Sequence, residues 1–191
     1  MRATLLDTTP DVTALLTYAC AHVGIPFRAV GTLSALYQAT QRAAEDDFLI
    51  LDLSLDRSED RALCREVVMR VAVEIHIMCP DGAFVRNLEQ VAAGPLAWLP
   101  PDVGWPALLQ TLRALRLKRL RARARTVHRD LSDRQKEVLA LVVRGRSQTA
   151  IAHMLGVTAG TIKSHVACIE GKLGVSSTEE LKLVFPWLTD L

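Results

Sequence analysis

The chain has 191 residues, half of them apolar, and a net charge of +2 at neutral pH. This length suits one medium and one small domain, and no apolar run is long enough to span a membrane. Asp7 follows the N-terminus too closely for a secretion signal, so we expect a cytoplasmic protein. The cysteines show no metal-ligand spacing and are predicted to be reduced, packed thiols. They are Cys20, Cys64, Cys79 and Cys168.

Charge is distributed unevenly along the chain. Residues 1–105 carry a net charge of −6, residues 106–130 carry +7, and residues 131–191 carry +1. An acidic block joined through a basic segment to a nearly neutral block indicates parts with separate tasks. We therefore predict a first domain of residues 1–117, a basic helical linker of residues 118–129, and a second domain of residues 130–191.

The first block alternates short apolar runs with helical patterns. The predicted strands are Thr4–Leu6, Phe27–Val30, Phe48–Leu53, Val73–Met78 and Leu96–Leu99. The predicted helices are Asp11–His22, Leu33–Ala44, Asp60–Arg70, Ala83–Ala92 and a long helix after Pro106. This alternation predicts an α/β fold with a doubly wound, parallel, five-stranded sheet. In that fold ligands bind beyond the carboxyl ends of the strands. The residues expected there are Asp7, Asp52, Cys79, Pro100 and Pro101.

The apolar stripe of the long helix changes direction part-way along. It runs first through Leu108, Leu112 and Leu115, and then through a second set that is surrounded by arginines. The second set is Leu117, Leu120, Ala124 and Val127. The change indicates two packing partners in succession. The first is the sheet, and the second is either another subunit or the C-terminal domain.

The last block has the pattern of four short helices. Ser132 and Gln135 form a predicted capping box, and Gly145 is a stop signal. Helices of about residues 148–155 and 159–173 flank the turn Gly156–Thr158, with Thr158 as cap and Gly174 as the end. The cluster at residues 176–178 opens a fourth helix, which Pro186 limits. Two helices joined by a three-residue turn with glycine are the outline of a helix-turn-helix.

The third of these helices has two contrasting faces. One stripe is apolar and is predicted to face the core; it consists of Ile162, Val166, Ile169 and Leu173. The opposite face holds small residues and Lys163. Small side chains allow the backbone to approach a DNA groove, and a lysine can reach guanine acceptors or a phosphate.

Four stretches of this block closely resemble the LuxR/FixJ-type DNA-binding domain. They are Leu131–Leu139, Gly145–Ala152, Gly156–Val166 and Lys172–Val175. The resemblance implies that Lys163, Ser164 and Ala167 face bases. It implies that Thr161, His165 and Lys172 lie near the phosphates of DNA. Gln148 and Thr149 are further candidates for phosphate contacts. It also implies a dimer contact on the last helix, about Thr178–Phe185. The candidate dimer contacts are the apolar Leu181, Val184 and Phe185, together with the Leu117–Val127 stripe of the long helix.

Three positions depart from that family's pattern. Ala167 replaces a usual polar or basic reader, Glu170 stands where an apolar residue is usual, and Gly171 stands where a basic residue is common. These departures predict thin base readout, with affinity supplied by phosphate contacts and by dimerisation.

The first block resembles the receiver domain of NarL-like response regulators. The resemblance rests on Asp7 with Pro10, on Phe48–Leu53, and on Ala92–Gly94 followed by Leu96–Leu99. It implies that Asp52 holds the phosphoacceptor position and that Trp98 holds the aromatic switch position. The pocket it implies is lined by Asp7, Thr8, Cys79, Trp98 and Pro101.

Several groups that receiver chemistry needs are missing from the sequence. Thr8 takes the place of a second carboxylate, and Cys79 takes the hydroxyl position, since no Ser or Thr lies between Ser58 and Thr111. No Lys or Arg occurs from Asn87 to Leu112, and Pro101 stands at or near the lysine position. We therefore predict a degenerate receiver that binds Mg²⁺ weakly at most, at Asp7 and Asp52. For Asp52 a solvated acid or a turn cap is the favoured interpretation.

Further candidates for chemistry are few. Glu74 and His76 share one face of a predicted strand, where a satisfied or solvent-edge pair is favoured over a metal site. Met78, Trp98 and Trp105 are expected to serve core or switch packing. The sequence has no phosphate-binding glycine loop, nucleophile elbow or metal-binding histidine pair, so no enzyme activity and no cofactor are predicted.

The sequence therefore predicts a transcription regulator that binds double-stranded DNA as a homodimer and acts on the transcription machinery. Regulation would be independent of ordinary aspartyl phosphorylation, through abundance or an unknown ligand or protein at the receiver pocket. Two alternatives stay open. One is a conventional regulator activated by phosphorylation. The other is an interaction protein whose helix-turn-helix does not read DNA.

Overall fold

The computed structural model describes residues 2–6, 10–41, 47–53, 58–99, 102 and 104–188, without the side chain of Leu33. They form two compact units, Met1–Arg116 and Leu117–Leu191. Of the predicted pocket residues, Asp7, Thr8, Pro100 and Pro101 lie outside the described residues.

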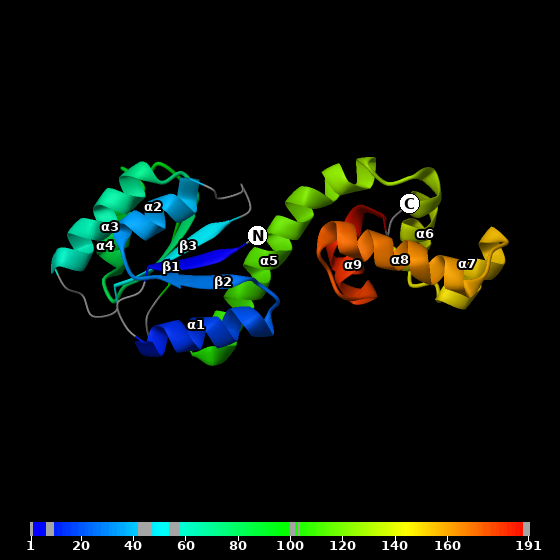
Figure 1. The fold of residues 1–191 in the computed structure, drawn as a ribbon, viewed down its shortest axis with the longest axis horizontal. Coiled ribbons are helices and arrows are strands. Elements are labelled where there is room, and N and C mark those ends of the chain that lie inside the picture. The colour runs from blue at the N-terminus through cyan, green and yellow to red at the C-terminus, as the bar shows by residue number, and fades with distance from the viewer. Residues whose placement is uncertain are drawn as a thin grey trace. The chain divides into compact units, whose positions relative to one another are not determined.

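The first unit is built on a parallel sheet with the strand order β2-β1-β3-β4-β5 (Figure 1). The strands are β1 (Ala3–Leu6), β2 (Phe27–Val30), β3 (Phe48–Asp52), β4 (Glu74–Met78) and β5 (Leu96–Leu99). Every pair of neighbours is parallel. Strands β1 and β3 are buried along their whole length, as expected for strands covered on both faces. The predicted doubly wound sheet is confirmed.

Helices cover both faces of this sheet. They are α1 (Pro10–His22), α2 (Leu33–Gln41), α3 (Ser58–Arg70), α4 (Gly82–Glu89) and the first part of α5 (Trp105–Arg129). Figure 1 shows α1 and the start of α5 on one side and the other three helices opposite them. One core cluster accordingly joins Leu16 and Leu112 to Phe48, and the other joins Val67 to Leu49. Alternate strand residues point to opposite faces, which divides the apolar residues between these two layers.

The second unit is a small helical domain. Besides the end of α5 it contains α6 (Asp133–Val143), α7 (Gln148–Leu155), α8 (Ala159–Leu173), α9 (Thr178–Val184) and a short 3₁₀ turn, Pro186–Leu188. Leu120 and Ala124 of α5 are buried in its core, and Leu117 and Val127 pack against it. Of the two partners considered for this part of α5, the structure therefore selects the C-terminal unit.

Two sequence-based expectations are wrong. Leu181, Val184 and Phe185 were expected to contact a second subunit, but each is fully buried in the core of its own unit. The reason is that α9 is short and its apolar side closes that core, which leaves Leu183 as its exposed apolar residue. Cys168 was expected to be packed and is exposed.

The other three cysteines are buried, as predicted. Burial raises the pKa of the Cys20 thiol to about 12. Burial, and after it the neighbouring Cys79, raises the pKa of the Cys64 thiol to about 12. These thiols are therefore protonated and poorly nucleophilic. Among the described residues, no helix has both the length and the apolar character needed to cross a bilayer.

Candidate functional site

The turn between α7 and α8 is fixed by local contacts at both of its ends. Helix α7 ends at Leu155, and its C-cap Gly156 has a left-handed backbone with φ of 64°. This conformation strains residues that carry a Cβ. Thr158 then caps α8, and its Oγ1 accepts a hydrogen bond of 3.2 Å from the backbone N–H of Thr161. The bounds predicted for both helices are confirmed, and so is the helix-turn-helix.

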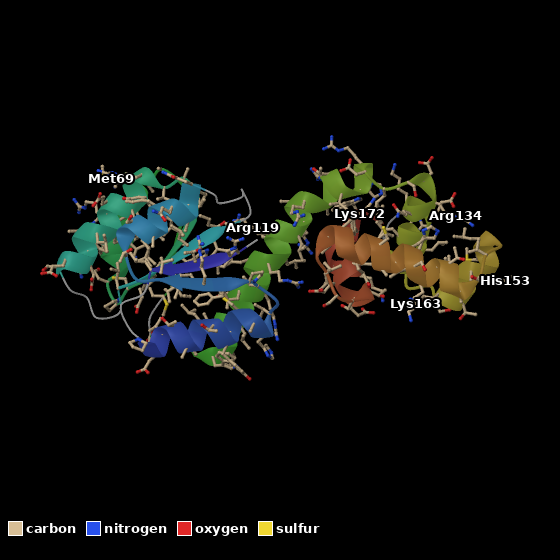
Figure 2. All side chains as sticks on the ribbon, in the orientation of Figure 1. Met69, Arg119, Arg134, His153, Lys163 and Lys172 are labelled. Atoms are coloured by element: carbon tan, nitrogen blue, oxygen red, sulfur yellow. The ribbon has the colours of Figure 1, made fainter. Side chains whose placement is uncertain are left out.

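Helix α8 has one buried and one exposed face. Ile162, Val166, Ile169 and Leu173 are buried, as their spacing predicted. Along the rest of the helix most side chains are small or short, and the cations Lys163 and Lys172 lie among them (Figure 2). The helix is thus held by its apolar stripe and presents a low surface with two exposed lysines and the half-buried Glu170. Its low profile and net positive charge suit close approach to a polyanion.

The residues predicted to face bases are all exposed. Lys163 contributes the one charged group of this set. Ser164 donates its hydroxyl hydrogen to the carbonyl of Gly160 at 3.1 Å, so its oxygen remains able to accept. Ala167 has no polar side-chain atom. Of these three residues, Lys163 is therefore the one that presents a long polar side chain to solvent.

Two of the predicted phosphate contacts already have partners within the domain. The Thr161 hydroxyl lies 2.9 Å from the Thr158 hydroxyl. Lys172 Nζ donates to the carbonyl of Asp130 at 3.2 Å and to Gln135 Oε1 at 3.4 Å. These contacts fix the two ends of α8. The ammonium of Lys172 has a third N–H, so a phosphate contact stays compatible with this geometry.

The other predicted phosphate contacts are placed differently. Gln148 and Thr149 are exposed on the first turn of α7, which Ser147 caps by accepting from the N–H of Ala150 at 3.2 Å. His165 is half-buried on α8. Side-chain positions at the start of a helix suit a phosphate, because backbone N–H groups there point outward without helical partners.

The sequence did not predict the contacts that Gln135 makes with other helices. Its Oε1 accepts from the N–H of Ser132 at 3.2 Å, which completes the predicted capping box. Its Nε2 also donates to Cys168 Sγ at 3.3 Å, and Oε1 meets Lys172 as well. One amide therefore joins the start of α6 to the last turns of α8. The capping-box pattern marked the residue but not its contacts across the domain.

Asp52 ends strand β3 and is 3% exposed. The interpretation of this residue as a solvated acid is therefore wrong. It lines a small cavity whose described wall also contains Leu6, Leu51, Leu53, Asp60, Leu63 and Cys64. The described part of this wall thus sets two carboxylates, those of Asp52 and Asp60, among leucines and a thiol.

Trp98 and Cys79 are joined at the carboxyl ends of β4 and β5. Trp98 Nε1 donates to the carbonyl of Cys79 at 2.8 Å, although 46% of the tryptophan is exposed. Its ring lies against Gly82, where a Cβ atom would come within 2.9 Å of it. These contacts hold Trp98 against the segment between β4 and α4. Trp98 therefore packs at the surface and not in the core.

The same segment is tied to α3 by a charged pair. Asp81 caps α4 by accepting from the N–H groups of Ala83 and Phe84, and Arg61 lies 3.2 Å from its other oxygen. The Phe84 N–H, and then Ala83 and Arg61, hold the pKa of Asp81 below its ordinary value. On β4, His76 Nε2 lies 3.3 Å from Glu74, and both side chains are nearly buried. The two residues thus form a close, nearly buried pair away from the solvent edge.

Comparison with known proteins places the C-terminal unit in a family. Residues 129–185 match the family of bacterial regulatory proteins described as the luxR family. The transcriptional regulatory protein MctR of Rhizobium johnstonii is 39% identical over 51 residues, which are 27% of this chain and 24% of MctR. The matched stretch thus spans about a quarter of that relative.

Solved structures resemble the chain over most of its length. Full-length FixJ from B. japonicum has 16% identity and a TM-score of 0.45, covering 100% of this chain and 98% of FixJ. RcsB from Salmonella enterica serovar Typhimurium, bound to a promoter with the phosphomimetic BeF₃⁻, has 19% identity and a TM-score of 0.45, covering 97% of each chain. The response regulator StyR has 21% identity and a TM-score of 0.39, covering 97% of this chain and 98% of StyR.

Proposed function

We propose that this chain, whose C-terminal unit belongs to the luxR family of bacterial regulatory proteins, regulates transcription by binding double-stranded DNA through α8. The binding species is a homodimer on an inverted repeat, because one helix with a single long reader covers too few base pairs to select a site alone. The bound dimer would act on the transcription machinery.

The exposed face of α8 is the observation that carries this proposal. Its buried stripe is locked in the core, and its outer face combines Lys163 with Gly160, Ser164 and Ala167. An ordinary surface helix would carry longer side chains and more acid there. In the alternative of an interaction protein, this face would have to bind a protein, yet it lacks the large apolar or aromatic anchors that protein interfaces favour.

Regulation without ordinary aspartyl phosphorylation is the second part of the proposal. Asp52 is buried in a largely apolar wall, and the sequence supplies no Lys or Arg from Asn87 to Leu112 to offset a phosphoryl group. Control would then come from protein abundance, or from a ligand or partner that binds one conformation of the first unit better than another.

The DNA-binding proposal is tested with genomic fragments and the full-length protein. Fragments selected by pull-down should show an inverted repeat in footprinting. Lys163→Ala should lose about 1–3 kcal/mol on the best fragment and relax the preference at one base pair. The matched control is Lys182→Ala, a change on α9 at a lysine that pairs with Glu179 at 2.9 Å. If Lys163→Ala binds like the parent, or if no fragment is selected, α8 is not a reading helix.

A further inference from the structure

The part of α5 that belongs to the second unit carries a dense run of positive charge. Residues 118–129 contain six lysines and arginines and no aspartate or glutamate. Three of the arginines, Arg121, Arg125 and Arg129, follow one another at intervals of four residues, so their side chains lie along one line of the helix. All three are exposed. We call this set the α5 basic line.

The buried side of α5 fixes the direction in which the α5 basic line points. Leu120 and Ala124 are buried in the core of the second unit. Successive residues of an α-helix are turned by roughly 100°, so Arg121 and Arg125, each one position after a buried residue, lie outside the buried stripe. The helix cannot rotate about its axis without opening that core. The α5 basic line is therefore held toward solvent.

The α5 basic line lacks acidic partners. Arg121 Nε donates to the carbonyl of Leu183 at 2.9 Å, and the guanidinium of Arg129 lies 3.4 Å from Thr126 Oγ1. In the part of the chain that the structure describes, no carboxylate forms an ion pair with the three arginines. Like charges four residues apart repel and destabilise a helix. A bound polyanion would offset this repulsion.

The α5 basic line ends beside the C-terminal turn of α8. Arg129 is the last residue of α5, and the carbonyl of Asp130 accepts a hydrogen bond of 3.2 Å from Lys172 Nζ. Lys172, labelled in Figure 2, is exposed in the last turn of α8. Asp130 adds one carboxylate at this junction, against Lys172 and the three arginines. The cationic surface of α8 therefore continues from Lys172 onto α5.

The chemistry of the α5 basic line fits a phosphate backbone. A guanidinium group binds phosphate oxygens through two parallel hydrogen bonds. From Arg121 to Arg129 the helix rises roughly 12 Å, a length over which one strand of B-DNA carries roughly three phosphates. A helix that binds a lipid surface needs large apolar side chains beside its cations. On α5 the exposed residues between the arginines include Ala122 and Thr126, and the apolar stripe is in the core.

We propose that the α5 basic line binds the phosphate backbone of the DNA that α8 contacts, outside the base pairs that α8 reads. This inference rests on the proposed function and deepens it, because it adds a second contact surface on the helix that precedes the helix-turn-helix. Phosphate contacts carry no sequence information, so α5 supplies affinity and α8 supplies selectivity. Such a division suits a reading helix on which Lys163 is the long polar side chain of the predicted base-facing set.

The test compares the full-length parent with the double variant Arg125→Gln and Arg129→Gln on the DNA fragment selected most strongly. Arg121 is left unchanged, because its bond to the Leu183 carbonyl also holds α5 to α9. The glutamine variant should bind roughly tenfold more weakly at about 0.1 M salt, and its slope of log K against log salt should decrease by about two per bound subunit. The preferred base sequence should stay the same. Hydroxyl-radical footprinting should show lost protection of the backbone at the edges of the site.

Two control variants separate a phosphate contact from a change of fold or of total charge. Arg125→Lys with Arg129→Lys keeps both charges and should keep the slope of the parent. Arg65→Gln with Arg86→Gln removes the same charge from exposed positions on α3 and α4 of the first unit, and it should also keep that slope. Urea unfolding should show that the glutamine variant is no less stable than the parent, because repulsion within α5 is reduced.

Three results would overturn this inference. The first is a glutamine variant with the slope and the footprint of the parent, or an equal loss in the control on α3 and α4. The second is tighter DNA binding by the glutamine variant, which would assign the arginines to an acidic surface of the protein itself. The third is an unchanged DNA slope together with binding of the parent, but not of the variant, to vesicles of anionic phospholipid.

Failure of this inference is distinguishable from failure of the proposed function. If a fragment is selected and the glutamine variant binds it like the parent, the role of the α5 basic line alone is refuted. If no fragment is selected, but the glutamine variant binds random-sequence DNA more weakly than the parent, α8 does not read DNA and the α5 basic line still contacts phosphates.

Discussion

Arg134 of α6 donates a hydrogen bond of 2.6 Å to the carbonyl of Leu155, the last residue of α7. The last carbonyls of a helix have no partner within that helix, so this bond satisfies one of them. The same bond connects α6 to the turn between α7 and α8, which sets the direction of α8. Glu137 holds the same guanidinium at 2.9 Å, which orients it toward the turn.

Arg134→Met should therefore loosen the turn while keeping most of the side-chain hydrocarbon. We expect a loss of about 1 kcal/mol in the free energy of unfolding, since a charged donor is removed from a partly exposed site. DNA affinity should fall as well, because α8 is less firmly oriented. Urea unfolding and fluorescence anisotropy measure the two effects.

Glu137→Gln is the control for Arg134, because it removes the ion pair and leaves the bond to Leu155 possible. Its cost should stay below about 0.5 kcal/mol. Equal losses from both variants would show that the ion pair, and not the bond to the turn, stabilises this region.

Two glycines of the helix-turn-helix should respond oppositely to alanine. Gly171 lies inside α8, and a Cβ added there meets open space. Gly171→Ala should raise the free energy of unfolding by about 1 kcal/mol, because alanine has the higher helix propensity. Gly156→Ala should lower it by about 1 kcal/mol, since φ of +64° strains any residue with a Cβ. Thermal unfolding of both variants decides this, and shifts of the same sign would contradict it.

The sequence was most informative where the signals are local. The capping box at Ser132, the turn at Gly156 and the cap at Thr158 all lie where the sequence predicted them. Such signals act between residues a few positions apart, and they hold in any tertiary setting. The alternation of strands and helices, and with it the doubly wound sheet, follows from equally short-range periodicity.

Contacts between segments that lie far apart in the chain could not be predicted from the sequence. Arg134 bonds a carbonyl 21 positions away and Lys172 one 42 positions away, and no spacing marks either pair. The apolar residues of α1 surround most of the helix, so periodicity could not separate the buried Leu16 from the exposed Tyr18. For α9, the pattern indicates an apolar side but does not say which core that side enters, so it could not exclude a subunit contact.

Lys172→Ala tests whether this lysine meets DNA in addition to its contacts within the domain. We expect affinity to fall to a similar degree for all sequences, and the slope of log K against log salt to decrease by about one. Titrations at several salt concentrations measure that slope. An unchanged slope, together with a lower free energy of unfolding, would restrict Lys172 to fastening α8 to Asp130 and Gln135.

His128 should make the second unit less stable in mild acid. Burial, and after it the charge of Lys136, lowers the pKa of His128 from its ordinary value of 6.5. The folded form therefore disfavours the protonated ring. The stabilisation that comes from the neutral His128 ring is complete above pH 6.5 and is lost as the pH falls through the lowered pKa. Urea unfolding from about pH 8 to about pH 5 should show this loss, and His128→Gln should reduce it. Identical pH profiles would exclude His128 as the cause.

Treatment with acetyl phosphate or beryllofluoride plus Mg²⁺ should leave DNA affinity within about twofold of the untreated protein. A phosphoryl group on Asp52 would add a charge of about −1.5 to −2 in a largely apolar wall that also contains Asp60, where like charges repel because they are poorly screened. The sequence from Asn87 to Leu112 offers no cation to offset it. The adduct should therefore be disfavoured and short-lived. Intact mass, sedimentation and anisotropy are measured on the parent and on Asp52→Asn in parallel. A stable adduct that tightens DNA binding about tenfold, or about 1.4 kcal/mol, and is absent from Asp52→Asn would establish a conventional phosphorylation-activated regulator instead.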